Sequence, residues 1–194
     1  RVQPESLFAR LNLAGALISK GQLDGAERLL QEVKLINPKF SNVDAALGLI
    51  YLRRKQYAAA ADSFARATYR EEPRAVDFAY AGFALAMQGK REPAAIALGK
   101  SLEMKPDNVL ALNFVGSILS KDGKLEEAIS YFRRVIDLYP EQTQVWTNLA
   151  HTLLLQGKVD EARAAYEEGY RRDPDAVPVL RNFANFEATH GRPE

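Results

Sequence analysis

The 194-residue sequence contains no cysteine, only two histidines and no excess of charge of either sign. The lack of cysteine excludes disulfides, thiolate metal ligands and cysteine nucleophiles, and it leaves the redox compartment open. Lys and Arg number 26 against 25 Asp and Glu, so the formal net charge of +1 gives no broad attraction to phosphate backbones or anionic lipid. We therefore expect a soluble protein, cytoplasmic or periplasmic, that binds no nucleic acid.

Long apolar runs are missing as well. The longest uncharged stretch, residues 142–157, carries Gln, Thr, Asn and His among its apolar residues. It falls short of the roughly 20 apolar residues that span a bilayer, so we expect no insertion into a membrane. The sequence starts at Arg1 rather than Met, with no leader-like segment before the first helical pattern. We interpret it as a segment of a longer protein.

Recognisable catalytic and metal-binding motifs are also missing. Neither His151 nor His190 belongs to an H-E-x-x-H pair or to a cluster with metal-ligand spacing. Residues 82–90 and 116–124 end in Gly-Lys like a phosphate-binding loop. Their glycines are seven residues apart instead of five, and no Ser or Thr follows the Lys. We therefore expect no catalytic residue, no cofactor and no metal.

What the sequence does contain is a period. Six of the nine prolines are spaced at intervals of 34, 35, 33, 34 and 34 residues, and four glycines each lie 17 residues before one of them. Lys55 stands near the corresponding place in the second repeat. Apolar residues between these marks follow helical spacing, so each repeat is predicted as a helix, a turn at Gly, a second helix and a turn at Pro. The marks are Pro4, Pro38, Pro73, Pro106, Pro140 and Pro174, with Gly21, Gly89, Gly123 and Gly157.

This pattern resembles the tetratricopeptide repeat family, whose 34-residue unit reads W-x2-L-G-x2-Y, then A-x3-F, then P. The resemblance implies an all-α fold, a right-handed α-solenoid of antiparallel helix-turn-helix repeats. Small residues such as Gly48, Gly82 and Gly116 are expected to admit a neighbouring helix, and Phe64, Phe132 and Tyr166 are expected to fill the gap between hairpins. Three repeats carry the motif most fully: Leu47, Gly48, Tyr51, Ala60, Phe64 and Pro73; Val115, Gly116, Ala128, Phe132 and Pro140; Trp146, Leu149, Ala150, Leu153, Ala162, Tyr166 and Pro174.

The resemblance covers nearly the whole chain and predicts its division. Residues 1–6 are expected to be the tail of a preceding repeat. Five repeats follow at 7–40, 41–74, 75–108, 109–142 and 143–176. Residues 177–194 are expected to form the first helix of a truncated sixth repeat. Because that repeat lacks its second helix, Leu180, Phe183 and Phe186 are expected to be incompletely covered, and end-to-end self-association is expected.

In tetratricopeptide proteins the first helices line a concave groove, so the resemblance also implies a partner-binding site. Polar side chains occupy one half of this predicted groove, with Gln144, Thr147 and Leu155 beside them, and apolar side chains occupy the other half. Two interpretations stay open for these residues, partner contact or ordinary solvation and packing. The predicted polar half is Asn113, Ser117, Lys121, Asn148, His151, Arg181, Asn182 and Asn185, and the apolar half is Tyr80, Phe83 and Met87.

The function predicted from these features is that of an interaction scaffold, without enzymatic activity, which binds an extended peptide or a helix of another protein. Two alternatives remain open. One is an accessory recruitment region of an enzyme such as a glycosyltransferase. The other is a periplasmic scaffold of a bacterial exopolysaccharide export or pilus assembly system. Arg181 and Asn185 mimic one pair of the family's two-carboxylate clamp, but the earlier repeats lack its basic residues, so a clamp is disfavoured.

Overall fold

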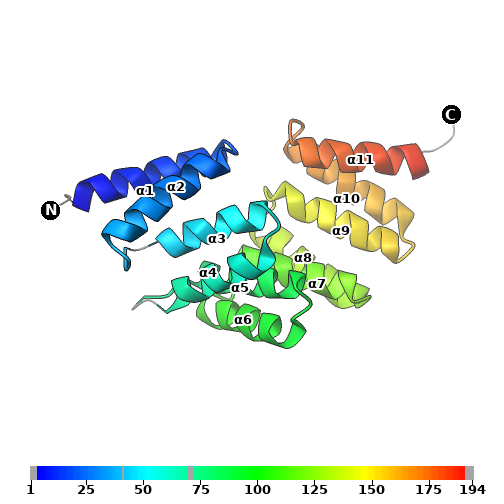
Figure 1. The fold of residues 1–194 in the computed structure, drawn as a ribbon. Helices are drawn as coiled ribbons and strands as arrows, with labels where there is room; N and C mark the ends of the chain where they lie inside the picture. Colours follow the sequence, from blue (N-terminus) through cyan, green and yellow to red (C-terminus); the bar gives the residue numbers. More distant parts are fainter. Residues whose placement is uncertain (1–3, 41, 70–71, 191–194) are drawn as a thin grey trace. The chain divides into compact units, whose positions relative to one another are not determined.

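The computed structural model describes residues 4–40, 42–69 and 72–190, and within them it contains eleven helices and no strand (Figure 1). The predicted all-α fold of consecutive helix pairs is confirmed. The chain divides into two compact units, Arg1–Met104 and Lys105–Glu194.

The N-terminal unit consists of three antiparallel helix pairs (Figure 1). Its first helix already begins at Pro4, inside the segment predicted as the tail of a preceding repeat, because proline is tolerated in the first turn of a helix. The pairs are α1 (Pro4–Ser19) with α2 (Leu23–Ile36), α3 (Val43–Arg53) with α4 (Tyr57–Thr68), and α5 (Ala75–Met87) with α6 (Arg91–Met104).

The C-terminal unit consists of two such pairs and one further helix. Its helices are α7 (Val109–Lys121), α8 (Leu125–Leu138), α9 (Thr143–Leu155), α10 (Val159–Arg172) and α11 (Val177–His190). The first helix of each predicted repeat is thus α7, α9 or α11 in this unit. The second helices are α8 and α10.

The turn inside each helix pair depends on a residue with positive φ. The four periodic glycines take φ values from 77° to 80°, the left-handed conformation that closes a helix and that glycine adopts without a steric penalty. In the second repeat Lys55 takes the same role with φ of 59°. The left-handed conformation costs a residue with a side chain roughly 1 kcal/mol. The turn therefore forms at Lys55 although its backbone preference disfavours it.

Each helix pair packs a small residue of its first helix against a large residue of its second. A Cβ atom added at Gly116 would lie 2.7 Å from the ring of Phe132, and one added at Gly48 would lie 2.7 Å from the ring of Phe64. Both phenylalanines are fully buried. The glycines are therefore needed because the ring occupies the space that a side chain would fill.

The last helix, α11, is covered more fully than the sequence predicts. Phe186 is only 3% exposed, since its ring packs 5.2 Å from the ring of Tyr166, with the Arg163 guanidinium 5.0 Å from its centroid. Phe183 is half-buried and also stacks on Tyr166. The expectation of incomplete cover is therefore wrong for Phe186. It holds for Leu180, which is 40% exposed.

Candidate functional site

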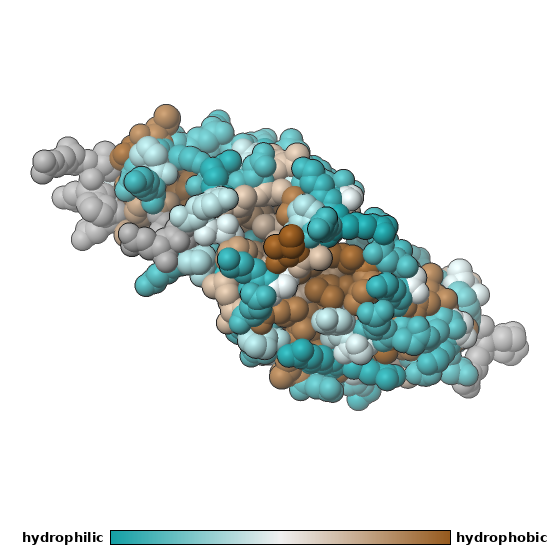
Figure 2. Space-filling model, turned by 90° about the horizontal axis from the view of Figure 1, so that it is seen from below, coloured by the Kyte–Doolittle hydropathy of each residue, from teal (hydrophilic) through white to brown (hydrophobic). Residues whose placement is uncertain are grey.

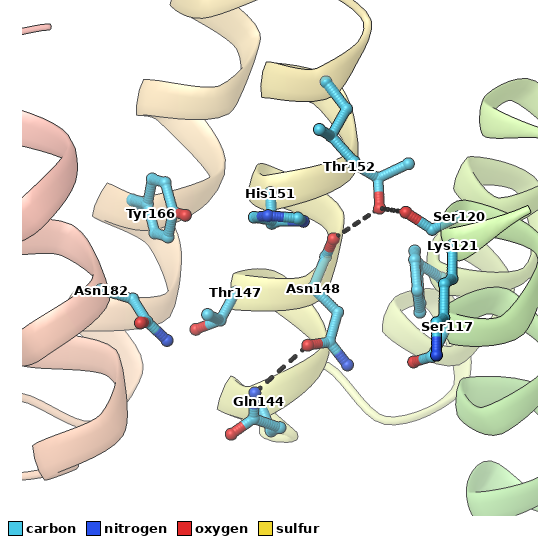
Figure 3. Close-up of a pocket in the computed structure, with 12 residues that line it drawn as sticks. Ser117, Ser120, Lys121, Gln144, Thr147, Asn148, His151, Thr152, Tyr166 and Asn182 are labelled. Atoms are coloured by element: carbon cyan, nitrogen blue, oxygen red, sulfur yellow. Dashed lines mark hydrogen bonds between the residues drawn. The ribbon is translucent and has the colours of Figure 1, made fainter. Parts of the chain in front are cut away.

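A polar cavity of 340 Å³ opens among the first helices of the C-terminal unit (Figure 3). The helices α7, α9 and α11 supply its polar side chains, while α8 and α10 contribute one aromatic ring each. The lining residues are Ser117, Ser120, Lys121, Phe132, Gln144, Thr147, Asn148, His151, Thr152, Leu155, Tyr166 and Asn182. Five of the predicted groove residues are among them: Ser117, Lys121, Asn148, His151 and Asn182.

On the α7 side of the cavity the predicted amides bond to each other. The Asn148 Nδ2 donates to the Asn113 Oδ1 at 2.9 Å, and the Gln144 Nε2 donates to the Asn148 Oδ1 at 3.2 Å. The Ser117 hydroxyl donates to the Asn113 carbonyl oxygen at 2.8 Å. These side chains are therefore held in fixed orientations, which leaves fewer free donors than the sequence alone indicates.

A second hydrogen-bonded chain joins α7 to α9 at the deeper end of this side. The hydroxyls of Ser120 and Thr152 lie 2.9 Å apart, and the Thr152 hydroxyl donates to the Asn148 carbonyl oxygen at 2.8 Å (Figure 3). Thr152 is 1% exposed, while Ser120 and Asn148 are partly buried. Sequence reasoning missed Ser120 and Thr152, and the helical spacing of Ser117 and Ser120 was the only signal for them.

On the α11 side the polar groups face one another without such bonds. Thr147 is only 5% exposed, and its hydroxyl oxygen has no hydrogen-bond partner in the described residues. The Thr147 hydroxyl and the Asn182 amide point toward each other from α9 and α11, with His151 and Tyr166 beside them (Figure 3). A buried hydroxyl without a partner is unfavourable, so this side of the cavity offers an unfilled hydrogen-bonding position.

Substitutions of Thr147 and Thr152 on α9 test this difference directly. Replacing Thr147 by Val is expected to raise the free energy of unfolding by about 1 kcal/mol, because it removes a buried hydroxyl that has no partner. Replacing Thr152 by Val is the matched control on the same helix. It is expected to lower the free energy of unfolding by about 1 kcal/mol, because it breaks two hydrogen bonds. Urea unfolding of both variants measures the difference, and a loss of stability in the Thr147 variant would contradict this assignment.

The remaining predicted residues of α11 lie outside this cavity. Arg181 and Asn185 are exposed, one turn apart on the same face. Arg181 makes no ion pair with any described residue, and neither does Lys121 at the opposite end of the cavity.

The predicted apolar half lies in the N-terminal unit, on α5. Tyr80 is half-buried and its ring stacks on Phe64 at 5.1 Å, and burial raises the pKa of its hydroxyl. Phe83 is half-buried, while Met87 is 39% exposed. Tyr80 therefore supports the core of its own unit, and Met87 is the most accessible of the three.

Sequence reasoning missed a second cavity in the N-terminal unit, of 380 Å³, between α4, α5 and α6. Apolar side chains such as Phe78, Leu85 and Ile96 line it, and Ile96 is 67% exposed. The signal in the sequence is that apolar residues of α6 are not confined to one face. Other apolar side chains also reach the surface, and Figure 2 shows such areas interspersed with hydrophilic ones.

No group of three or more His, Asp or Glu residues that could hold a metal ion occurs in the part of the chain that the structure describes. Among the described helices, none combines the length and the apolar character needed to cross a bilayer.

Solved structures of low sequence identity share this fold. A thermophilic TPR protein of Thermus thermophilus, TTC0263, superposes with a TM-score of 0.85 at 18% identity, over 94% of this chain and 99% of that one. PilW, a type IV pilus biogenesis factor, gives a TM-score of 0.77 at 18% identity, over 96% and 92% of the two chains. YrrB, a TPR protein described as having an unusual peptide-binding site, gives 0.58 at 21% identity, over 89% of each.

Sequence comparison identifies the repeats themselves. None of the curated proteins matches this sequence significantly. Family models of the tetratricopeptide repeat match residues 2–50, 84–143 and 116–177. These ranges include most of the helix pairs described above, with their glycine turns and small-on-large contacts. The chain therefore belongs to the tetratricopeptide repeat family.

Proposed function

We propose that this chain binds an extended segment of another protein in the polar cavity formed by α7, α9 and α11. The observation that carries the proposal is the cavity itself, 340 Å³ in volume and lined on three first helices by hydroxyl, amide and imidazole groups. An extended segment presents backbone N–H and C=O groups, and amide and hydroxyl side chains can both donate to and accept from them. Tetratricopeptide proteins bind other proteins or peptides, and YrrB is described as having a peptide-binding site, which is in keeping with this role.

A binding role fits the chemistry of the cavity better than a catalytic one. The Ser120 hydroxyl bonds to another hydroxyl, that of Thr152, rather than to a base. His151 is exposed and has no hydrogen-bond partner among the described residues, so nothing orients it toward a nucleophile. A general base needs such a partner within hydrogen-bonding reach.

The α5 residues Phe83 and Met87 are proposed as an apolar contact for a partner in the N-terminal unit. Met87 is exposed and flexible, and methionine adapts to apolar surfaces of different shape. Tyr80 contributes by holding Phe64 in place.

Panning a random dodecapeptide phage library against the chain tests the main proposal. The double variant His151→Ala, Asn182→Ala is expected to weaken binding of the selected peptides about tenfold, since it removes two hydrogen-bonding groups of the cavity. Fluorescence anisotropy with the labelled peptides measures the change.

The control variant is Arg133→Ala on α8, whose side chain is exposed and lies 3.6 Å from the Glu161 carboxylate. It is expected to bind the peptides like the original chain. Normal binding by the cavity variant together with lost binding by the Arg133 variant would show that partners dock on the second helices.

A further inference from the structure

We infer that the segment held in this cavity is acidic: Lys121 pairs with one of its carboxylates on the α7 side, while Thr147 and Asn182 hold one of its backbone peptide groups on the α11 side. This inference rests on the proposed function and names the chemistry of the partner. It follows from two observations, the distribution of charge in the C-terminal unit and the unfilled hydrogen-bonding position at Thr147.

Charge is segregated between the two sets of helices in this unit. The second helices α8 and α10 carry both signs, with ion pairs such as that between Arg133 and Glu161. The first helix α9 carries no charged residue, and α7 carries only Lys121. On α11 the single acid, Glu187, is already paired with Arg163, which leaves Arg181 as the second unpaired cation. The face formed by the first helices therefore has positive charge that nothing within it neutralises.

The lining of the cavity repeats this imbalance. Its residues include one Lys and no Asp or Glu. The nearest acid in the sequence, Asp122, follows α7 and does not line the cavity. A carboxylate entering the cavity thus meets a cation without meeting a like charge, and opposite charges at close range attract even near the protein surface. A basic segment would instead be repelled by Lys121 and would find no carboxylate in the lining.

Thr147 is the buried polar residue of the proposed site. Its side chain is 5% exposed, and its hydroxyl is one of the few buried polar groups in the described residues without a hydrogen bond. Asn182 points toward it from α11 across the cavity (Figure 3). A hydroxyl and an amide together can accept from a peptide N–H and donate to a peptide C=O, so a bound backbone would supply the missing partner.

The 194-residue chain and a random dodecapeptide phage library provide the test. The selected peptides are expected to be enriched in Asp and Glu relative to the unselected library. For a labelled acidic peptide, Lys121→Gln is expected to weaken binding about fivefold to tenfold, whereas Lys121→Arg keeps it, because one charge-assisted contact is lost or retained. Lys124→Gln is the matched control, since this exposed lysine pairs with Glu127 and does not line the cavity. Lys124→Gln is expected to leave the affinity for the labelled peptide unchanged.

Thr147→Val adds a readout that a purely structural role would not produce. It is expected to weaken binding of the same peptide by roughly fivefold while the unbound chain becomes more stable, because the hydroxyl gains its partner only in the complex. A Thr147 variant that binds normally would overturn the assigned backbone contact.

The outcomes separate this inference from the proposed function. Peptides that depend on His151 and Asn182 but are neutral or basic would overturn the acidic partner and leave peptide binding intact. A phosphoserine peptide that binds more than tenfold tighter than its glutamate counterpart would also overturn it, because the recognised group would then be a phosphate. A library that yields no peptide, or only peptides insensitive to the cavity variants, would overturn both.

Discussion

Replacing Gly116 by Leu is expected to lower the free energy of unfolding of the C-terminal unit by about 3 kcal/mol, the upper part of the range for overpacked cores. The first added carbon would already lie 2.7 Å from the Phe132 Cε1 and 3.0 Å from its Cδ1. Phe132 is fully buried, so its ring cannot move aside without displacing other core residues. Urea unfolding followed by circular dichroism measures the loss.

Gly99 supplies the control for this substitution. It also lies inside a helix, α6, but a Cβ atom added there meets nothing within 4 Å. Gly99→Ala is therefore expected to leave stability unchanged or to raise it by up to about 1 kcal/mol, since alanine is the better helix former. An unchanged unfolding curve for the Gly116 variant would mean that α7 and α8 do not approach as closely as described.

The first repeat indicates how overpacking at residue 116 can be relieved. The first repeat has Ala14 and Leu30 at the places that Gly116 and Phe132 occupy in the fourth, and both are fully buried. The double variant Gly116→Ala, Phe132→Leu is therefore expected to be more stable than Gly116→Ala alone, because the smaller side chain at 132 leaves room for the added methyl group.

Replacing Arg74 by Met is expected to lower the free energy of unfolding of the N-terminal unit by about 2 kcal/mol, because the Asp77 end of this ion pair is buried while the Arg74 side chain is 45% exposed and partly screened by solvent. The Arg74 Nε and Nη2 donate to the two carboxylate oxygens of Asp77 at 2.9 Å and 2.7 Å. Asp77 is 1% exposed, so the substitution removes two charge-assisted hydrogen bonds from a carboxylate that water does not reach. Thermal and urea unfolding measure the change.

The comparison variant is Arg66→Met. The Arg66 side chain is also half-exposed, but the side chain of its partner Asp44 is 22% exposed, against 1% for Asp77. We expect a loss below about 1 kcal/mol, as for other exposed pairs. Equal effects of the two substitutions would contradict a special contribution from the buried carboxylate of Asp77.

Much of the fold could be predicted because it depends on repetition along the chain. Prolines near every 34th residue and glycines 17 residues before four of them predict where helices end. The φ values at Gly21, Gly89, Gly123 and Gly157 confirm the glycine turns. Gly116 was predicted as a site of close helix approach, and the structure confirms this, with the Phe132 ring as the neighbour. Such features are local, or repeat at constant spacing, and composition and periodicity are sufficient to find them.

The sequence by itself determined the family, the helix pairs and which polar residues α7, α9 and α11 carry. Only the tertiary structure decided which hydrogen bonds their side chains make. Asn113 and Asn148, 35 residues apart, bond to each other, while Thr147 and Thr152 on one helix differ completely in their partners. Helical periodicity indicates which residues share a face, but not the rotation of a helix against its neighbours. That rotation buries the Thr147 hydroxyl without a partner and encloses Phe186 between Tyr166 and Arg163.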